Sequence, residues 1–187
     1  MRGFVAIALP DEIRAALASV QQDLAKSQAD VAWVSPANLH VTLKFLDEIS
    51  DEQARAVTAL LQRIAGREAS FALSLSGVGA FPSREAPRVV WVGLSEGNEI
   101  IARIAEEIER EGAALALPKE MRTFSPHLTI GRVRSPQHRA ALVQALATAA
   151  WQPPEPWEAS SLILYQSVLR ADGPRYSVVA EVPLSKR

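Results

Sequence analysis

Apolar residues recur every three or four positions in four stretches of the chain, which is the spacing of amphipathic helices. The first and third stretches cover residues 11–27 and 98–114. The second opens with a Ser-x-x-Gln capping box at Ser50 and stops near Gly66. The fourth begins at Ser135-Pro136, where a proline suits the first turn of a helix. The pattern therefore predicts four helices.

Shorter apolar or alternating runs between these stretches predict β-strands. They cover residues 4–7, 40–45, 71–76, 89–92, 127–132, 162–165 and 176–179. The resulting order is strand–helix–strand–helix–strand, given twice and followed by a closing strand.

One sequence pattern occurs twice, about half a chain apart. Residues 38–43 (Asn-Leu-His-Val-Thr-Leu) recur as residues 125–130 (Ser-Pro-His-Leu-Thr-Ile), an offset of 87 residues. The same offset relates the first predicted helix to the third and the second to the fourth. We therefore expect a duplicated α+β fold, in which two lobes are related by a pseudo-twofold axis. Each lobe should have a mainly antiparallel sheet with outer helices, and the sheets should face each other across a central cleft.

The two lobes are expected to form one domain over residues 1–187. The approximate halves of the repeat are residues 1–86 and 87–187. The repeat is also compatible with an exchange of strands between the two lobes. A polar loop bracketed by prolines, at residues 81–87, is the expected boundary between the lobes.

The composition narrows the class of protein. The chain has 187 residues, a net charge of -1, 48% hydrophobic residues and no cysteine. The lack of cysteine excludes disulfides, thiol nucleophiles and cysteine-ligated metal sites. No apolar run approaches the roughly 18 residues of a membrane span, and the first run is too short for a signal peptide. We expect a globular cytoplasmic protein that does not enter membranes.

The repeated pattern places a His-x-Thr pair in each of two strands. Side chains alternate between the faces of a strand, so His40, Thr42 and Lys44 should share one face. His127 and Thr129 should share a face in the same way. A single His-x-Thr is most often ordinary structure, because threonine is a good strand former. Two copies at equivalent positions of a repeat favour a functional site instead.

Two imidazoles that face each other suit concerted acid–base chemistry, because one takes a proton while the other gives one. The two threonine hydroxyls next to them can donate hydrogen bonds to a bound anion. This combination fits phosphoryl transfer. Two histidines without a nearby carboxylate are a poor metal site, so we expect neither a metal nor a cofactor. The symmetry of the pattern leaves open which histidine is the acid.

Cations and aromatic side chains around the motifs are candidates for substrate binding. Lys44 is the best placed cation, and Arg122 follows it because strand alternation turns Arg132 away from His127 unless a bulge intervenes. The candidates for base stacking are Phe81, Tyr165 and Tyr176.

Further segments beside the two motifs are typical of one known family. The chain resembles the two-histidine phosphoesterases, and within them the bacterial and archaeal RNA 2',3'-cyclic phosphodiesterases, also called 2'-5' RNA ligases. The resemblance covers almost the whole chain. It is carried by residues 2–7, 38–46, 77–82, 124–129, 166–169 and 173–176. One departure is Asp47, which stands where relatives usually have glycine, and we expect an altered turn there without loss of activity.

The resemblance implies that a terminal 2',3'-cyclic phosphate on RNA is opened by water to leave a 2'-phosphate. It implies that His40 is the general acid and His127 the general base, and that Thr42 and Thr129 hold the phosphate oxygens. Some members of the family also join RNA ends reversibly through a 2'-5' linkage without ATP. The expected partners are RNA ends with a cyclic phosphate, tRNA halves among them, and the expected state is a monomer.

Two other functions stay open. The same site could act on small cyclic nucleotides or on 2'-5' oligoadenylates, or the protein could bind RNA ends without catalysis. Affinity that grows with RNA length and falls with salt would distinguish an RNA enzyme from a nucleotide enzyme. A degenerate motif would favour the binding module, and neither motif is degenerate.

Overall fold

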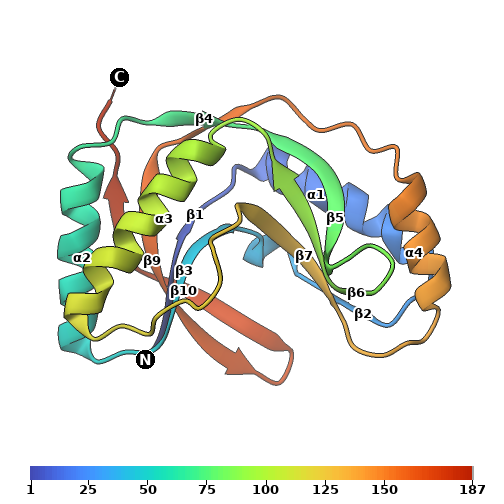
Figure 1. The fold of residues 1–187 in the computed structure, drawn as a ribbon, viewed down its shortest axis with the longest axis horizontal. Coiled ribbons are helices and arrows are strands. Elements are labelled where there is room, and N and C mark those ends of the chain that lie inside the picture. Colours follow the sequence, from blue (N-terminus) through green and yellow to red (C-terminus); the bar gives the residue numbers. More distant parts are fainter. Residues whose placement is uncertain (187) are drawn as a thin grey trace.

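A computed structural model describes residues 1–186 and contains two four-stranded antiparallel sheets (Figure 1). The first sheet consists, in spatial order, of β10 (Gly173–Pro183), β9 (Ser161–Arg170), β1 (Arg2–Ile7) and β3 (Val41–Glu48). The second consists of β2 (Val31–Trp33), β7 (His127–Val133), β6 (Pro87–Leu94) and β5 (Leu75–Pro82). A small third sheet pairs β4 (Phe71–Leu73) with β8 (Trp157–Ala159).

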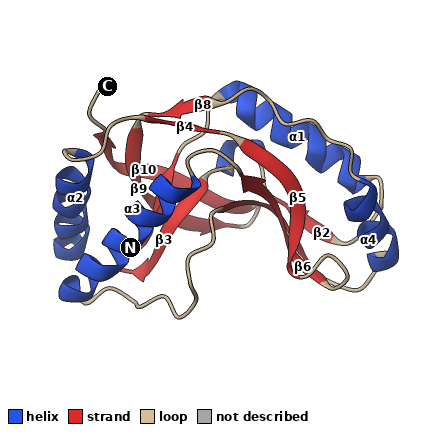
Figure 2. Ribbon diagram, turned by 45° about the horizontal axis from the view of Figure 1, so that its top comes forward, coloured by secondary structure: helices blue, strands red, loops and turns tan. Residues whose placement is uncertain are grey.

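The helices form two layers on opposite flanks of the molecule, with the sheets between them (Figure 2). The first sheet is covered by α2 (Asp51–Ala65) and α3 (Asn98–Gly112). The second is covered by α1 (Asp11–Ala25), which packs on β7 and on α4 (Arg139–Thr148). Two short 3-10 helices, η1 (Pro36–Asn38) and η2 (Ala113–Leu115), complete the fold. The expected α+β architecture of two lobes with outer helices is confirmed.

The chain passes repeatedly between the two lobes. The first sheet takes β1 and β3 from the first half of the sequence and β9 and β10 from the second half. The second sheet likewise takes β2 and β5 from the first half, with β6 and β7 from the second. A lobe is therefore not a continuous half of the sequence.

The proline-bracketed segment at residues 81–87 does not separate the lobes. It is the turn of a hairpin inside the second sheet, where Pro82 at the end of β5 pairs with Pro87 at the start of β6. The expected boundary is therefore wrong. The physical reason is that prolines mark a turn, and a turn within a sheet has the same local signals as a turn between lobes.

Three of the four predicted helices form close to their expected limits. α1 and α3 begin 87 residues apart, and Ser50 and Gln53 form the capping box that opens α2. The fourth helix begins later than predicted, at Arg139, because His138 before it adopts a left-handed conformation with φ 53°. The run at 71–76 is interrupted at Ser74, so that β4 pairs with β8 and β5 with β6.

Asp47 occupies a left-handed backbone conformation, with φ 52°, near the end of β3. This conformation costs a residue with a Cβ atom about 1 kcal/mol or more, whereas glycine adopts it freely. The side chain is exposed and has no hydrogen-bond or salt-bridge partner among residues 1–186. The aspartate is therefore tolerated at a site that favours glycine, and the altered turn stays a prediction.

We predict that Asp47→Gly stabilises the protein. Relief of the left-handed strain should raise the free energy of unfolding by about 0.5–1 kcal/mol, or the melting temperature by about 1–4 °C. Asp47→Ala is the matched control, because it also removes the carboxylate but keeps the Cβ, and it should give no such gain. Thermal unfolding followed by circular dichroism measures both, and equal melting temperatures for the two variants would contradict the prediction.

Candidate active site

The two sheets approach each other at the strands of the motifs, since β3, which begins directly after His40, contacts β7, which begins at His127 (Figure 1). The cross-strand register shows which side chains share a face. In the first sheet Ala6 pairs with Thr42 and Phe4 pairs with Phe45, so these residues lie on one face. We call this the inner face, because α2 and α3 cover the other one. The corresponding inner face of the second sheet carries Thr129 opposite Trp91.

A β-bulge after Thr42 changes the alternation in β3. The register shifts between Val5 and Ala6, whose partners are Lys44 and Thr42, so Leu43 is an extra residue. Lys44 therefore lies on the helix-covered face, and Phe45 lies on the inner face instead. The expectation that Lys44 shares the face of His40 is wrong, because simple alternation does not allow for the bulge.

The contacts of Lys44 agree with this placement. Its side chain is 4% exposed, and its Nζ donates to Glu109 Oε2 in α3 at 2.5 Å and to the Pro118 carbonyl at 2.7 Å. All of these partners lie on the side of the sheet that faces away from the histidines. Lys44 is thus a buried structural cation and is not placed to bind phosphate.

An equivalent bulge occurs in β7, but there it turns a cation, Arg132, toward the inner face. In β7 the register shifts so that Thr129 pairs with Trp91 and Gly131 with Val90, which leaves Ile130 as the extra residue. Arg132 then pairs with Val89, on the inner face that carries Thr129. Regular alternation would turn Arg132 away from His127, and the bulge reverses this, so ranking Arg122 above Arg132 is not supported. Ile130 lies 87 residues after Leu43, and Arg132 lies 87 residues after Phe45.

His40 is held by hydrogen bonds at both ring nitrogens. Its Nδ1–H donates to the Asn38 carbonyl at 2.6 Å, which fixes the tautomer, and the Thr42 hydroxyl donates to Nε2 at 2.8 Å. The ring packs against Phe4 and Tyr176, with ring centres 4.8 and 5.5 Å away. Burial lowers the pKa of His40 below its ordinary value, although the bond to the Asn38 carbonyl opposes this. His40 is therefore biased toward the neutral imidazole.

His127 has an equivalent anchor in a more open setting. Its Nδ1–H donates to the Ser125 carbonyl at 2.6 Å, two residues upstream as in the first motif. The Phe81 ring meets the imidazole edge-to-face, with 5.0 Å between ring centres. Burial lowers the pKa of His127, the Ser125 carbonyl raises it, and the nearby Arg132 guanidinium lowers it again. The net direction is downward, so His127 also favours the neutral form.

The two histidine rings are anchored through the same ring nitrogen. Each Nδ1 is committed to a backbone carbonyl, so each Nε2 is the atom available for proton transfer. A neutral ring with a free Nε2 lone pair is a general base, and the same ring carrying a proton at Nε2 is a general acid. The geometry thus supports either role at either histidine.

Aromatic rings surround both histidines on the inner faces. Two of the predicted stacking candidates, Tyr165 and Tyr176, lie near His40, and the third, Phe81, touches His127. The sequence interpretation missed Phe4 beside His40, and Phe45, which is 54% exposed. The repeat could have indicated Phe4, because Phe4 and Trp91 are aromatic residues at equivalent positions, 87 residues apart.

Arg122 lies in the loop between α3 and β7. Its backbone N–H donates to Glu120 at 3.2 Å, and its exposed side chain makes no ion pair within residues 1–186. The structure does not bring it into contact with either histidine. Within the same residues, no group of three or more His, Cys, Asp or Glu side chains is arranged to hold a metal ion.

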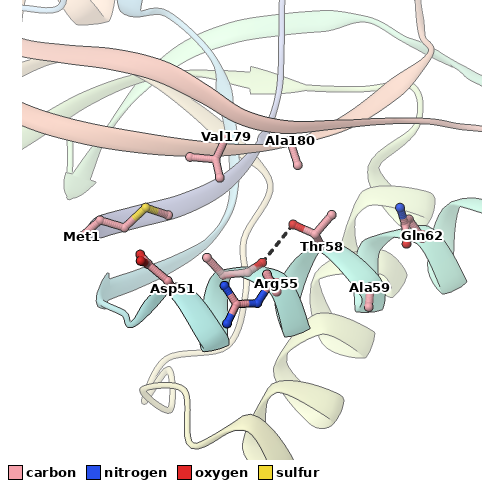
Figure 3. A pocket seen from close by; sticks show the side chains of 9 residues that line it. Met1, Asp51, Arg55, Thr58, Ala59, Gln62, Val179 and Ala180 are labelled. Atoms are coloured by element: carbon pink, nitrogen blue, oxygen red, sulfur yellow. Dashed lines mark hydrogen bonds between the residues drawn. The ribbon is translucent and has the colours of Figure 1, made fainter.

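Two hollows of the surface lie away from the motifs. The first, of about 380 Å³, runs between α2 and β10 and is lined by Arg55, Thr58 and Val179 among others (Figure 3). The second, of about 250 Å³, lies beside the end of α3 and includes Glu109 and Lys119. Neither contains a motif residue, so we identify the site from its chemistry.

Comparisons with known proteins agree with the site. The family model "LigT like Phosphoesterase" matches residues 7–91 and again residues 92–176, which reproduces the internal duplication. The RNA 2',3'-cyclic phosphodiesterase of Aeropyrum pernix is 34% identical over 166 residues, covering 89% of this chain and 93% of the relative. That of Aquifex aeolicus is 36% identical over 152 residues, covering 80% and 79%.

Solved structures give the same result for the fold. A crystal structure of a Thermus thermophilus protein has a TM-score of 0.80 at 30% identity and covers 100% of both chains. E. coli LigT in complex with 3'-AMP has a TM-score of 0.78 at 28% identity, covering 99% of this chain and 98% of that one. Two matched repeats, two anchored histidines and relatives matched along nearly their whole length lead to one conclusion. The chain belongs to the LigT-like phosphoesterase family, within the two-histidine phosphoesterases.

Proposed function

We propose that the protein is an RNA 2',3'-cyclic phosphodiesterase, which hydrolyses a terminal 2',3'-cyclic phosphate to a 2'-phosphate. The observation that carries this proposal is the matched pair of imidazoles, each with Nδ1 fixed by a carbonyl and Nε2 available. The relatives from Aeropyrum pernix, Aquifex aeolicus and Methanocaldococcus jannaschii are named for this activity.

In the proposed mechanism the two histidines act on opposite sides of the phosphorus atom. Nε2 of neutral His127 takes a proton from water, whose oxygen forms the new bond to phosphorus. The bond from phosphorus to the 3' oxygen breaks, and protonated His40 gives its Nε2 proton to that oxygen. The product carries a 2'-phosphate and a free 3'-hydroxyl, and the two histidines have exchanged protonation states.

The side chains next to the histidines support the phosphate in this scheme. The hydroxyls of Thr42 and Thr129 lie on the two inner faces, two residues after each histidine, and donate to the non-bridging oxygens. Thr42 becomes free to do so when His40 is protonated at Nε2, because the ring then no longer accepts its hydroxyl proton. Arg132 supplies positive charge on the inner face that carries His127. A bound phosphodiester anion raises the pKa of both histidines, which restores the protonated form that His40 needs as an acid.

The assignment of acid and base follows the family pattern. Burial lowers the pKa of both histidines, so the pKa shifts do not distinguish the acid from the base. The same step with a 5'-hydroxyl in place of water forms the new bond to phosphorus, releases the 3' oxygen as before, and so joins RNA ends through a 2'-5' linkage. Ligation therefore needs no residues beyond those used for hydrolysis.

Small nucleotides are the second candidate for the substrate. The related E. coli LigT has been solved in complexes with 3'-AMP, ATP and NADP+, so a mononucleotide fits the site of that relative. For the protein described here we favour RNA ends, tRNA halves among them, bound by a cytoplasmic monomer. No helix among residues 1–186 is long and apolar enough to cross a membrane. Since neither motif is degenerate, a purely binding role is the weakest of the three functions.

The first prediction concerns the two histidines. His40→Ala and His127→Ala should each lower kcat for an oligoribonucleotide with a 2',3'-cyclic phosphate end by about 10²–10⁴-fold, because each removes a proton-transfer group. The assay is run with excess EDTA, and wild-type turnover should persist there. His138→Asn is the control, since asparagine tolerates the left-handed conformation of the third histidine and activity should not change. Turnover that survives loss of either motif histidine would overturn the assignment.

The second prediction contrasts two arginines. Arg132→Met should lower kcat/KM on the order of tenfold to a hundredfold, because it removes the cation on the inner face. Arg122→Met should change kcat/KM much less, because that side chain is exposed on the loop and contacts neither histidine. Steady-state kinetics on the same substrate measure both values. A larger loss for the Arg122 variant would show that the site extends toward the loop instead.

The third prediction concerns pH. Turnover requires one protonated and one neutral histidine, so kcat/KM should follow a bell-shaped curve whose limbs report the free enzyme. Since the pKa values of His40 and His127 are both lowered from 6.5, both limbs move toward acid and the maximum lies below pH 6.5. The kcat curve should be displaced to higher pH, because the bound anion raises both pKa values. A kcat/KM maximum at or above pH 7 would contradict the burial of the two rings.

A further inference from the structure

Lys44, the buried cation in β3, forms hydrogen bonds that hold the loop leading to His127. Lys44 Nζ contacts Glu109 Oε2 at 2.5 Å and donates to the Pro118 carbonyl at 2.7 Å. The other oxygen of the carboxylate, Glu109 Oε1, accepts the backbone N–H of Glu120 at 2.9 Å. One ion pair thus holds the loop at two backbone atoms, one on each side of Lys119. We call these four residues, Lys44, Glu109, Pro118 and Glu120, the clamp.

The clamp joins parts of the molecule that belong to different lobes. Lys44 lies in β3, two residues beyond Thr42, and Glu109 lies in α3, which covers the same sheet. The loop that they hold, residues 117–126, leaves the first lobe at the end of α3 and enters the second lobe at His127. The loop is therefore fixed to the first lobe just before it delivers the second histidine.

The far end of this loop controls the ring of His127. Ser125, five residues after Glu120, provides the carbonyl that accepts the His127 Nδ1–H at 2.6 Å. This bond fixes the tautomer and raises the pKa of the ring against the effect of burial. Between the clamp and Ser125, Phe124 packs partly buried against the core, so the segment is held at both ends.

The clamp has a composition that stability alone does not explain. Lys44 is 4% exposed and Glu109 is 31% exposed, and a pair this deeply placed gains little over apolar side chains of similar size. Buried ion pairs of this kind serve better to specify one arrangement, because any displacement leaves a charge without its partner. Here the arrangement that is specified includes two backbone atoms of the loop.

We propose that Lys44 and Glu109 are positioning residues, which hold the loop at residues 117–126 and, through Ser125, orient the imidazole of His127. The two histidine motifs are then coupled, because the strand that carries Thr42 also fixes the approach to His127. The effect on turnover rests on the proposed function, whereas the effect on the His127 ring does not. Neither residue needs to touch the substrate.

The test uses Lys44→Met/Glu109→Met, which removes both charges together. Each single variant leaves the other charge unpaired and should lower the melting temperature, whereas the double variant should recover most of it. The loop in the double variant still loses both of its clamp contacts. We expect kcat for a 2',3'-cyclic phosphate oligoribonucleotide to fall tenfold or more, with KM changed less than about threefold, because the ring of His127 is misplaced.

The direct measurement is the titration of His40 and His127 by NMR. Weakening of the bond to Ser125 should lower the pKa of His127 in the double variant, while the pKa of His40 keeps its wild-type value. The matched control is Arg63→Met/Glu111→Met, which removes an ion pair of 2.7 Å between α2 and α3 that does not contact the loop. Its kcat and its His127 pKa should both stay at wild-type values.

The outcomes separate this proposal from the proposed function. If the pKa of His127 is unchanged in a folded double variant, the positioning role is overturned. This holds even if kcat falls, because the loss of activity would then arise from a change in β3 and Thr42. A lowered pKa of His127 in the double variant supports the positioning role of Lys44 and Glu109 even if the wild-type protein does not open cyclic phosphates. In that case it is the proposed function that fails.

Discussion

One extra residue directly after the threonine of each motif governs what the two inner faces carry. Before the bulges at Leu43 and Ile130, each strand presents its threonine to the inner face. After them the alternation is inverted, so that Phe45 and Arg132 follow and Lys44 turns toward the helices. Because the bulges recur at the same offset as the motifs, both lobes present their side chains in the same order. The site depends on this backbone irregularity as much as on the identity of its residues.

Both bulges are held by a buried polar side chain, although the two lobes use different chemistry. Beside the first, Lys44 reaches from β3 to Glu109 in α3. Beside the second, Gln21 reaches from α1 and donates from Nε2 to the carbonyls of Val34 and Ile130, both at 2.8 Å. An ion pair in one lobe thus corresponds to an amide in the other. Only the ion pair also holds the loop before His127, which makes the two halves of the site unequal in spite of their common pattern.

The sequence predicted what depends on periodicity, and it failed where the chain departs from a regular period. Helical spacing located α1, α2 and α3, and the offset of 87 residues located both motifs and the duplication. Alternation misplaced Lys44 and Arg132, because a bulge depends on how a strand pairs with its neighbour and leaves no local signal in sequence. The hairpin at residues 81–87 was misread for a similar reason, since the partner of a strand is a non-local property. The sequence was compatible with an exchange of strands between the lobes but did not require it, because the pairing of strands is non-local.

That interchange has a consequence for how such a molecule can arise. β5 and β9 are equivalent strands, since the offset maps residues 75–82 onto 162–169, and each completes the sheet of the opposite half. A chain of half this length, with one motif, would lack the third strand of its own sheet and could obtain it only from a second copy. Two such copies would form a closed, self-complementary pair with one histidine from each partner. The present chain has the architecture of that strand-swapped dimer, joined end to end into a single polypeptide whose two halves were then free to diverge.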